Sequence, residues 1–234
     1  MRDGTPVYAV TGGTAHLENE NAIAIDTGSV DFGYWHIVPA VRHRQAVWRH
    51  QVLGHVLAPW AHVHFAERRR GTYVDPLRPG ALTPWNDPTS PRIAAITFER
   101  GGRVVRPQAV AGDVDVIVEA YDRPPLRPPE PWSGAILTPC LVRWRVLRRG
   151  RVVRPWHTPV DFRALLPHER FAGVYAPGTR QNRPGKPGRY RFFVAHTWST
   201  DLLPDGGYRL EAEAADERGN LARAGLDFVL ANRV

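Results

Sequence analysis

The chain has 234 residues, of which 43% are hydrophobic and 23% charged. These fractions are close to globular averages, so they exclude wholesale disorder. No apolar run approaches the roughly 20 residues that a membrane-spanning helix needs. The single cysteine, Cys140, excludes an internal disulfide, and we interpret it as a buried apolar residue rather than a nucleophile. With 21 glycines and 22 prolines, the composition favours short strands and many turns over long helices.

The formal net charge of +8 comes from 31 basic residues, and Lys186 is the only lysine among them. A basic chain can bind a polyanion such as nucleic acid or an acidic cell wall. So strong a preference for arginine is more typical of a GC-rich genome than of phosphate binding. The arginines are spread along the chain, and no nucleic-acid-binding motif is present. We therefore predict no nucleic-acid partner. A nucleic-acid binder, the rival interpretation, would lose affinity steeply with salt.

Short segments typical of strands fill the first third of the chain. They are separated by turn signals such as Thr11-Gly12-Gly13 and Asp26-Thr27-Gly28. No amphipathic helix lies between them, which predicts an antiparallel β barrel or sandwich. The predicted strands are Pro6–Val10, Thr14–Leu17, Ala22–Ile25, Phe32–Val38, Gln51–Leu57 and Ala61–Glu67.

A composition shift predicts two domains. Seven of the ten histidines lie before residue 65, whereas the prolines concentrate after residue 75. A proline-rich stretch can be neither a helix nor a central strand, so residues 78–91 are predicted to be a linker. The expected domains are then residues 1–77 and 92–234.

The second predicted domain also consists of strands. The segment Leu141–Leu147 alternates as a strand does, with Val142, Trp144 and Val146 on one face and Leu141, Arg143, Arg145 and Leu147 on the other. Six further segments predict strands or hairpins, and about seven short strands in 140 residues match an immunoglobulin-like β-sandwich. The proline-rich stretch 123–132 is predicted to be a stiff loop, with a polyproline ligand as the alternative. The further strands are predicted at 93–98, 114–121, 152–153, 190–194, 208–214 and 226–230.

The segment Ala61-His62-Val63-His64-Phe65 carries the clearest chemical signal. Side chains alternate along a strand, so both imidazoles are predicted to lie on one face. Two such rings can share a metal ion, or one can bind it while the other orients a water molecule. A His-x-His pair alone is more often structural, so its surroundings decide its interpretation.

In chain order, those surroundings resemble the lysostaphin-like zinc metallopeptidases, which cut peptidoglycan cross-bridges. The resemblance covers residues 4–77 and rests on four pieces. They are Gly4-Thr5-Pro6-Val7, Tyr34-Trp35-His36, the glycine-containing segment Gln51-Val52-Leu53-Gly54-His55, and His62-Val63-His64-Phe65-Ala66-Glu67. It implies a lysostaphin-like antiparallel β domain, a zinc cofactor and a peptidoglycan substrate.

The resemblance also implies a role for each histidine. His64 would be a zinc ligand, while His62 and His36 would be catalytic histidines that activate the water or stabilise the transition state. Zinc lowers the pKa of its bound water and polarises the scissile carbonyl, and neighbouring imidazoles can then move the proton. The tryptophans Trp35 and Trp60 would flank a substrate groove.

One departure from the family pattern leaves three accounts open. Family members take two further zinc ligands from a His-x-x-x-Asp segment upstream of the Gly-Thr-Pro-Val strand. Here Met1 lies three residues before Gly4, so that segment would fall before Met1 and the peptidase domain would be incomplete at its N-terminus. The chain is therefore expected to be a fragment, a pseudoenzyme, or a protein that binds metal in an altered way. As a fragment or a pseudoenzyme it would be catalytically inactive, because two of the three zinc ligands are absent. Nothing in the spacing of six further polar residues favours them as substitute ligands, and we interpret them as solvated side chains of strands and loops: His16, Asp26, Asp31, His43, His50 and His55.

The expected partner is peptidoglycan or an anionic cell-wall polymer. The resemblance implies an extracytoplasmic location, although the given sequence begins without a signal peptide. A non-catalytic wall-binding or scaffold module, in which the second domain binds the partner, is the alternative function.

Overall fold

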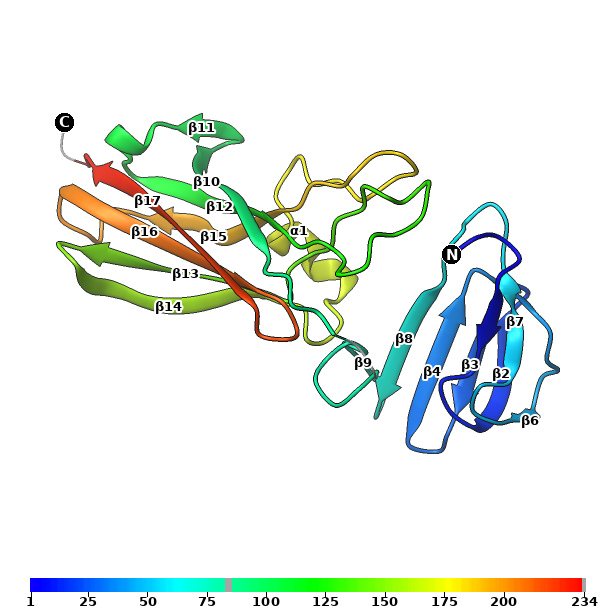
Figure 1. Cartoon of the computed structure of the whole chain (residues 1–234). Coiled ribbons are helices and arrows are strands. Elements are labelled where there is room, and N and C mark those ends of the chain that lie inside the picture. Colours follow the sequence, from blue (N-terminus) through cyan, green and yellow to red (C-terminus); the bar gives the residue numbers. More distant parts are fainter. Residues whose placement is uncertain (83–85, 233–234) are drawn as a thin grey trace. The chain divides into compact units, whose positions relative to one another are not determined.

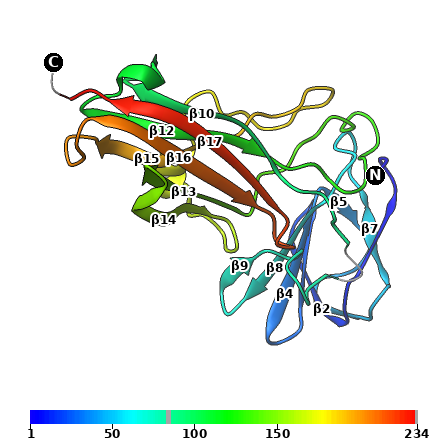
Figure 2. The ribbon, with the colours of Figure 1, turned by 60° about the vertical axis from the view of Figure 1, so that its left-hand side comes forward.

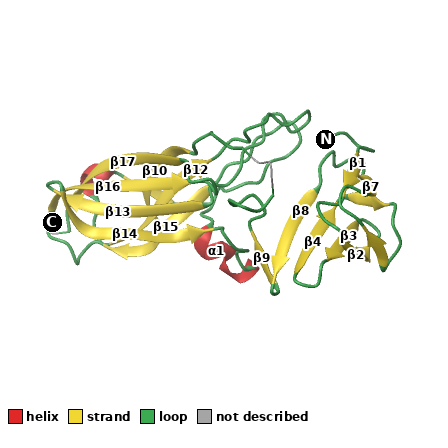
Figure 3. Ribbon diagram, turned by 60° about the horizontal axis from the view of Figure 1, so that its bottom comes forward, coloured by secondary structure: helices red, strands yellow, loops and turns green. Residues whose placement is uncertain are grey.

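The computed structural model describes residues 1–82 and 86–232 and is nearly all β (Figure 1). Strands hold 52% of the residues, and every pairing between named strands is antiparallel. In the described part of the chain, helical structure is confined to the four-residue α1, Phe171–Val174, and two 3₁₀ turns (Figure 3). This confirms the all-β prediction. None of the described helices has the length and hydropathy that crossing a bilayer requires.

The chain divides into two compact units, Met1–Thr83 and Pro84–Val234, which are described separately. The predicted linker comprises residues 78–91. Its first part is hydrogen-bonded to unit 1 and its later part to unit 2. Arg78 donates hydrogen bonds of 2.9 and 2.8 Å to the carboxylate of Glu67 in unit 1. In unit 2, the side-chain amide of Asn220 donates to the backbone carbonyl of Asp87 at 2.7 Å.

Unit 1 contains two antiparallel sheets. The larger has the strand order β6-β2-β3-β4-β8-β9 and the smaller β1-β7-β5 (Figures 1 and 2). The strands of the larger sheet are β2 (Gly13–Asn19), β3 (Ala22–Asp26), β4 (Val30–Trp35), β6 (Gln45–Val47), β8 (His64–Arg69) and β9 (Thr72–Val74). Those of the smaller sheet are β1 (Pro6–Tyr8), β5 (Ile37–Pro39) and β7 (Val52–Val56).

The core of unit 1 lies between these sheets. Ile23 and Ile25 of β3 pack with Leu53 and Val56 of β7, and all four are at most 2% exposed. Ile23 and Ile25 are two residues apart on β3, so their side chains lie on the same face. A sheet with one buried and one solvated face requires such a spacing of its apolar residues. Tyr34 is also buried there; its hydroxyl accepts a hydrogen bond from the N–H of Val10 at 3.0 Å, and burial raises its pKa to about 12.

Two strand predictions in unit 1 were wrong at the histidines. The predicted strand Phe32–Val38 is two strands, β4 and β5, because His36 has a left-handed φ of 63° that interrupts the extended backbone. The predicted strand Ala61–Glu67 begins only at His64, because Ala61 has a φ of 54°. His62 therefore lies in the loop that enters β8.

Unit 2 is a sandwich of two four-stranded antiparallel sheets, with strand orders β11-β10-β12-β15 and β14-β13-β16-β17. The first sheet contains β10 (Arg92–Arg100), β11 (Arg103–Val105), β12 (Asp113–Tyr121) and β15 (Arg191–Ser199). The second contains β13 (Leu141–Arg148), β14 (Arg151–Asp161), β16 (Gly206–Ala215) and β17 (Leu221–Leu230). The third and sixth long strands of unit 2, β13 and β16, thus lie side by side at the centre of one sheet.

Two side chains identify the immunoglobulin-like arrangement. Trp144 on β13 is fully buried and packs at right angles to Trp198 of the opposite sheet, with ring centroids 5.4 Å apart. Tyr208, near the start of β16, donates its hydroxyl to the carbonyl of Pro204 four residues upstream at 2.6 Å. A buried tryptophan on the third strand and a tyrosine corner are hallmarks of this fold. The predicted immunoglobulin-like sandwich is therefore confirmed, as are the buried face of Leu141–Leu147 and the burial of Cys140.

Removing the tyrosine-corner hydrogen bond tests the sandwich. We expect Tyr208→Phe to lower the free energy of unfolding of unit 2 by about 1 kcal/mol, because the carbonyl of Pro204 loses its donor while the buried ring remains. Urea unfolding followed through unit 2 amide signals measures the change. Tyr8→Phe, at an exposed position in unit 1, is the control and should leave that value unchanged.

Candidate functional site: a histidine cluster

The position of His36 follows from the end of β4. Trp35 is the last residue of that strand and pairs with His64, the first residue of β8. The next residue, His36, therefore leaves the sheet beside the start of β8. Its imidazole stacks on the indole of Trp60, with ring centroids 4.3 Å apart and planes tilted by 13°.

The loop between β7 and β8 is held against His36 by backbone contacts. The N–H of Leu57 donates to the carbonyl of His36 at 2.8 Å, and the N–H of Trp60 donates to the carbonyl of Leu57 at 3.0 Å. The N–H of Ala61 is bound at 2.9 Å by the carboxylate of Asp3. Asp3 thus fixes the loop, a role that the sequence analysis missed because the partners are 58 residues apart.

The two rings of the His-x-His segment face each other. The Nδ1 of His62 lies 2.6 Å from the carbonyl oxygen of Trp60, and its Nε2 lies 3.1 Å from the Nε2 of His64. Only a protonated Nδ1 can donate to a carbonyl, which leaves the Nε2 of the neutral ring as a lone-pair donor. The lone pair is therefore directed towards His64.

His36 completes a cluster of three imidazoles. Its ring centroid lies 4.5 Å from that of His64 and 5.1 Å from that of His62. One nitrogen from each of the three rings lies within 4.8 Å of the others. His36 and His62 are half-buried and His64 is exposed, so the cluster is open to solvent on one side.

The pKa values of two of these rings are lowered. For His36 the main cause is burial, followed by the neighbouring His62. For His64, which is exposed at its edge, the partial burial of the ring again comes first, followed by His36 and then His62. A lowered pKa keeps an imidazole neutral near pH 7, and the neutral ring is the form that binds metals.

The donor set fits a zinc ion. Two nitrogens bound to a tetrahedral zinc at about 2.0–2.1 Å lie roughly 3.3 Å from each other, close to the 3.1 Å between His62 and His64. A second-shell carbonyl, that of Trp60, orients the ring of His62 as metal-binding histidines require. Three histidines with one open side are a known catalytic zinc arrangement.

The polar residues considered as substitute ligands lie elsewhere. Asp31 forms an ion pair with Arg68, and Asp26 accepts a hydrogen bond from the N–H of Gly28 at 2.6 Å. The rings of His16 and His43 contact each other, with centroids 5.4 Å apart. Across residues 1–82 and 86–232, none of the six joins the histidine cluster.

Unit 2 contains a second group of titratable side chains, which the sequence analysis did not single out. Asp87, Asp122 and Asp216 are 6%, 3% and 5% exposed, and their carboxylate oxygens lie within 4.8 Å of one another. Each carboxylate accepts a nearby backbone N–H, including that of Thr89 at 2.9 Å and that of Arg218 at 2.8 Å. We interpret this cluster as structural, because each member stabilises its own turn.

Comparisons with known proteins identify few similar chains. No protein-family model matches the sequence, and no curated protein does. The NMR solution structure of lysostaphin is similar over 95% of this chain and 85% of its own, with 15% identity and a TM-score of 0.30. The antimicrobial peptidase lysostaphin from Staphylococcus simulans is similar over 96% of this chain and 87% of its own, with 14% identity and a TM-score of 0.29. At these scores we base no conclusion about the site on the likeness.

The acidic cluster generates a pH-dependence test. Burial, aided by the charges of Asp87 and Asp216, raises the pKa of Asp122 from 3.8 to about 6. The folded protein then holds this proton more tightly than the unfolded chain, so the stabilisation is complete below about pH 4 and is lost as the pH rises through about 6. We expect Asp122→Asn to remove this slope of the free energy of unfolding against pH. The variant should also stabilise unit 2 at pH 7.5 by up to about 3 kcal/mol.

Urea unfolding of unit 2 between pH 4 and 7.5, with EDTA present, measures this effect. Asp201→Asn changes an exposed aspartate of the same unit and should keep the wild-type slope. An Asp122→Asn protein with the wild-type slope would show that Asp122 does not carry the effect.

Proposed function

We propose that this protein is a zinc-dependent hydrolase of peptidoglycan peptide bonds whose metal is held by His36, His62 and His64. The observation that carries the proposal is that three imidazole nitrogens lie within 4.8 Å of one another in a cluster that is open to solvent on one side. The sequence left three accounts open, and the proposal corresponds to the third, in which the protein binds metal in an altered way. It differs from the family pattern, in which only His64 of these three would be a ligand.

The chemistry of the cluster suits hydrolysis. His36, His62 and His64 would hold a zinc ion that, when bound, would lower the pKa of a water molecule towards neutrality and polarise a carbonyl oxygen. His64 is exposed, so a substrate could reach the cluster from the side of this residue.

The surrounding residues would orient the histidines. Trp60 fixes two rings at once, since its indole stacks on His36 and its carbonyl binds the Nδ1 of His62. The indole also supplies a flat apolar wall, 45% exposed, on which a peptide or sugar could pack. The bond between Asp3 and Ala61 would keep this loop closed onto the cluster.

The substrate class comes from the ordered motifs of unit 1. The Gly4–Val7, Tyr34–His36 and His62–Glu67 segments occur in the order found in peptidoglycan endopeptidases. Peptidoglycan is therefore the proposed partner and substrate, and an extracytoplasmic site of action follows from that substrate.

Zinc binding by single variants tests the proposed ligand set. We expect the chelator-stripped protein to take up about one zinc per chain, and His36→Ala, His62→Ala and His64→Ala each to weaken zinc binding by more than about 100-fold, because each removes a ligand. Metal analysis after dialysis and competition with a chromophoric chelator measure both quantities. Release of soluble fragments from purified peptidoglycan should fall with each variant in parallel.

The control is His55→Ala, which removes an exposed histidine on β7 outside the cluster. It should bind zinc as the wild type does. If only His64→Ala lost zinc while the other two variants kept it and lost hydrolysis, His36 and His62 would be catalytic residues rather than ligands. Absence of zinc from the wild-type protein would overturn the proposal.

A further inference from the structure

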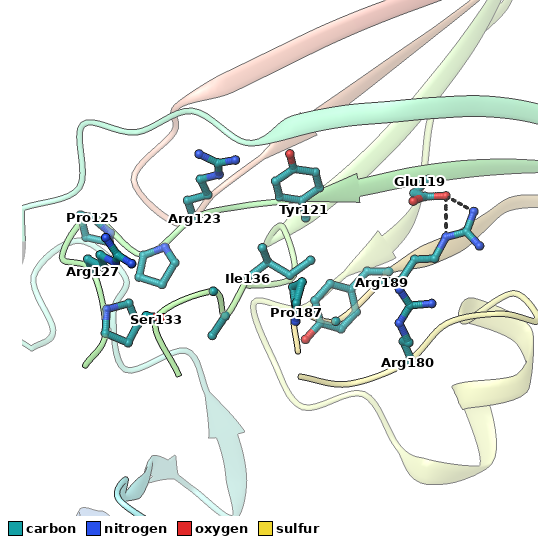
Figure 4. A pocket seen from close by; sticks show the side chains of 16 residues that line it. Glu119, Tyr121, Arg123, Pro125, Arg127, Ser133, Ile136, Arg180, Pro187 and Arg189 are labelled. Carbon is teal, nitrogen blue, oxygen red and sulfur yellow. Dashed lines mark hydrogen bonds and ion pairs between the residues drawn. The ribbon is translucent and has the colours of Figure 1, made fainter. Parts of the chain in front are cut away.

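Unit 2 contains a pocket of about 980 Å³ at the end of the sandwich where β12 finishes (Figure 4). Two irregular segments form it: the proline-rich loop between β12 and β13, and the hairpin that precedes β15. Its size is at the upper end of the range typical of ligand pockets, about 300–1,000 Å³. All of its lining residues belong to unit 2, and none of them is a residue of the histidine cluster.

The two segments are fixed to each other by Asn182. Its side-chain oxygen accepts hydrogen bonds from the N–H groups of Ile136 at 3.0 Å and Gly188 at 2.8 Å. Its side-chain NH₂ donates to the carbonyl of Ile136 at 2.7 Å and to the hydroxyl of Tyr190 at 3.3 Å. One amide thus uses all its hydrogen-bonding capacity to hold the pocket walls together, which prepares the pocket for a ligand.

Two further contacts support this arrangement. The N–H of Gly185, at the hairpin tip, donates to the carbonyl of Pro131 in the opposite loop at 2.7 Å. Within the hairpin, Gly188 lies so close to the opposite arm that a Cβ there would be 2.9 Å from the carbonyl oxygen of Arg180. The irregular walls are therefore closely packed and held at several points.

The charge of the lining is strongly positive. Its basic side chains are Arg123, Arg127, Arg180 and Arg189, and its only acidic side chain is Glu119. Glu119 is already paired with Arg189, whose Nε and Nη2 lie 3.0 and 2.6 Å from one carboxylate oxygen (Figure 4). Within the described residues the other three arginines form no ion pair, so three exposed guanidinium groups border one cavity.

The remaining lining is flat and apolar. Tyr121 and Tyr190 supply aromatic rings, and four prolines of the two segments supply ring faces. Flat rings of this kind pack against the faces of sugars, while arginine binds carboxylate and phosphate groups through paired N–H donors. The combination therefore fits a carbohydrate that carries negative charges.

The backbone of the pocket disfavours an extended peptide. Peptides that add to a sheet edge need unpaired N–H and C=O groups. Here Arg180 and Arg189 bond each other in both directions at 2.8 Å. Asp122 and Leu137 likewise exchange bonds of 2.8 and 2.9 Å. Recognition must therefore come from side chains.

From these observations we infer that the pocket of unit 2 binds an anionic glycan, a sugar or polyol polymer with phosphate or carboxylate groups. Arg123, Arg127 and Arg180 bind the anionic groups, and Tyr121 and Tyr190 pack on the neutral part of the chain. The inference goes beyond the proposed hydrolysis and does not require it.

Binding of defined polymers to the full-length protein tests this inference. The probes are poly(glycerol phosphate), polygalacturonate, neutral dextran and poly-glutamate, and calorimetry is performed in EDTA so that the histidine cluster plays no part. We expect poly(glycerol phosphate), polygalacturonate or both to bind, and dextran to show no binding. Which of the two anionic polymers binds distinguishes recognition of phosphate from recognition of carboxylate. Changing Arg123, Arg127 and Arg180 together to Gln should raise the dissociation constant at least about tenfold, because charged hydrogen bonds are lost.

The matched control changes Arg103, Arg151 and Arg170 together to Gln. These are three exposed arginines of unit 2 outside the pocket, so the loss of net charge is the same. The control should keep wild-type affinity within about twofold, whereas the pocket variant should also lose about two units of the slope of log K against log salt. Equal weakening of both triple variants would overturn the inference, as would binding of poly-glutamate in preference to both anionic glycans. Failure of the wild-type protein to bind either glycan would overturn it as well.

A variant of opposite sign completes the test. Glu119→Gln removes the only carboxylate of the lining and releases Arg189, so the affinity for the bound glycan should rise several-fold. A Glu119→Gln protein that binds more weakly would contradict the proposed role of the arginines.

Discussion

Trp35 and His64 lie opposite each other in the antiparallel pair β4–β8, and the geometry of the histidine cluster depends on that register. Because β4 ends at Trp35, the chain must turn at the next residue, and His36 does so with a φ of 63°. Its ring then stacks on Trp60 rather than continuing the alternation of the strand. A slip of one residue between the two strands would move every side chain of one strand to the other face and separate His36 from His64. The cluster is thus a product of sheet register as much as of residue type.

Alternation of side chains carried most of the fold prediction. It placed Val142, Trp144 and Val146 on one face of a strand, and all three are fully buried. The prediction from alternation failed where a residue other than glycine leaves the strand conformation, as His36 does. A positive φ at such a residue cannot be recognised from the residue types. The three-residue strands β6 and β9 were also missed, since so short a segment shows no period.

The candidate site was predictable only in part, for a related reason. The spacing His-x-His indicated that two rings would meet, and the Nε2 atoms of His62 and His64 are 3.1 Å apart. The approach of His36 depends on strand pairing across more than 25 residues, and here only the family resemblance suggested it. The anchoring of the loop by Asp3 joins residues 58 positions apart, and no local pattern records such a contact.

The arginines show why net charge alone did not reveal the pocket. On the sandwich strands they lie opposite acids: Arg143 pairs with Glu213, and Arg145 with Glu211, each as a direct cross-strand partner. Opposite charges on directly facing residues favour one strand register, and they neutralise each other on the sheet. In the loops after β12 and before β15, Arg123, Arg127 and Arg180 have no such acidic partner among the described residues, and all three line one cavity. Arginines that look evenly spread along the sequence are therefore placed by the fold in different settings, some opposite acids on the sheets and some around the cavity of unit 2.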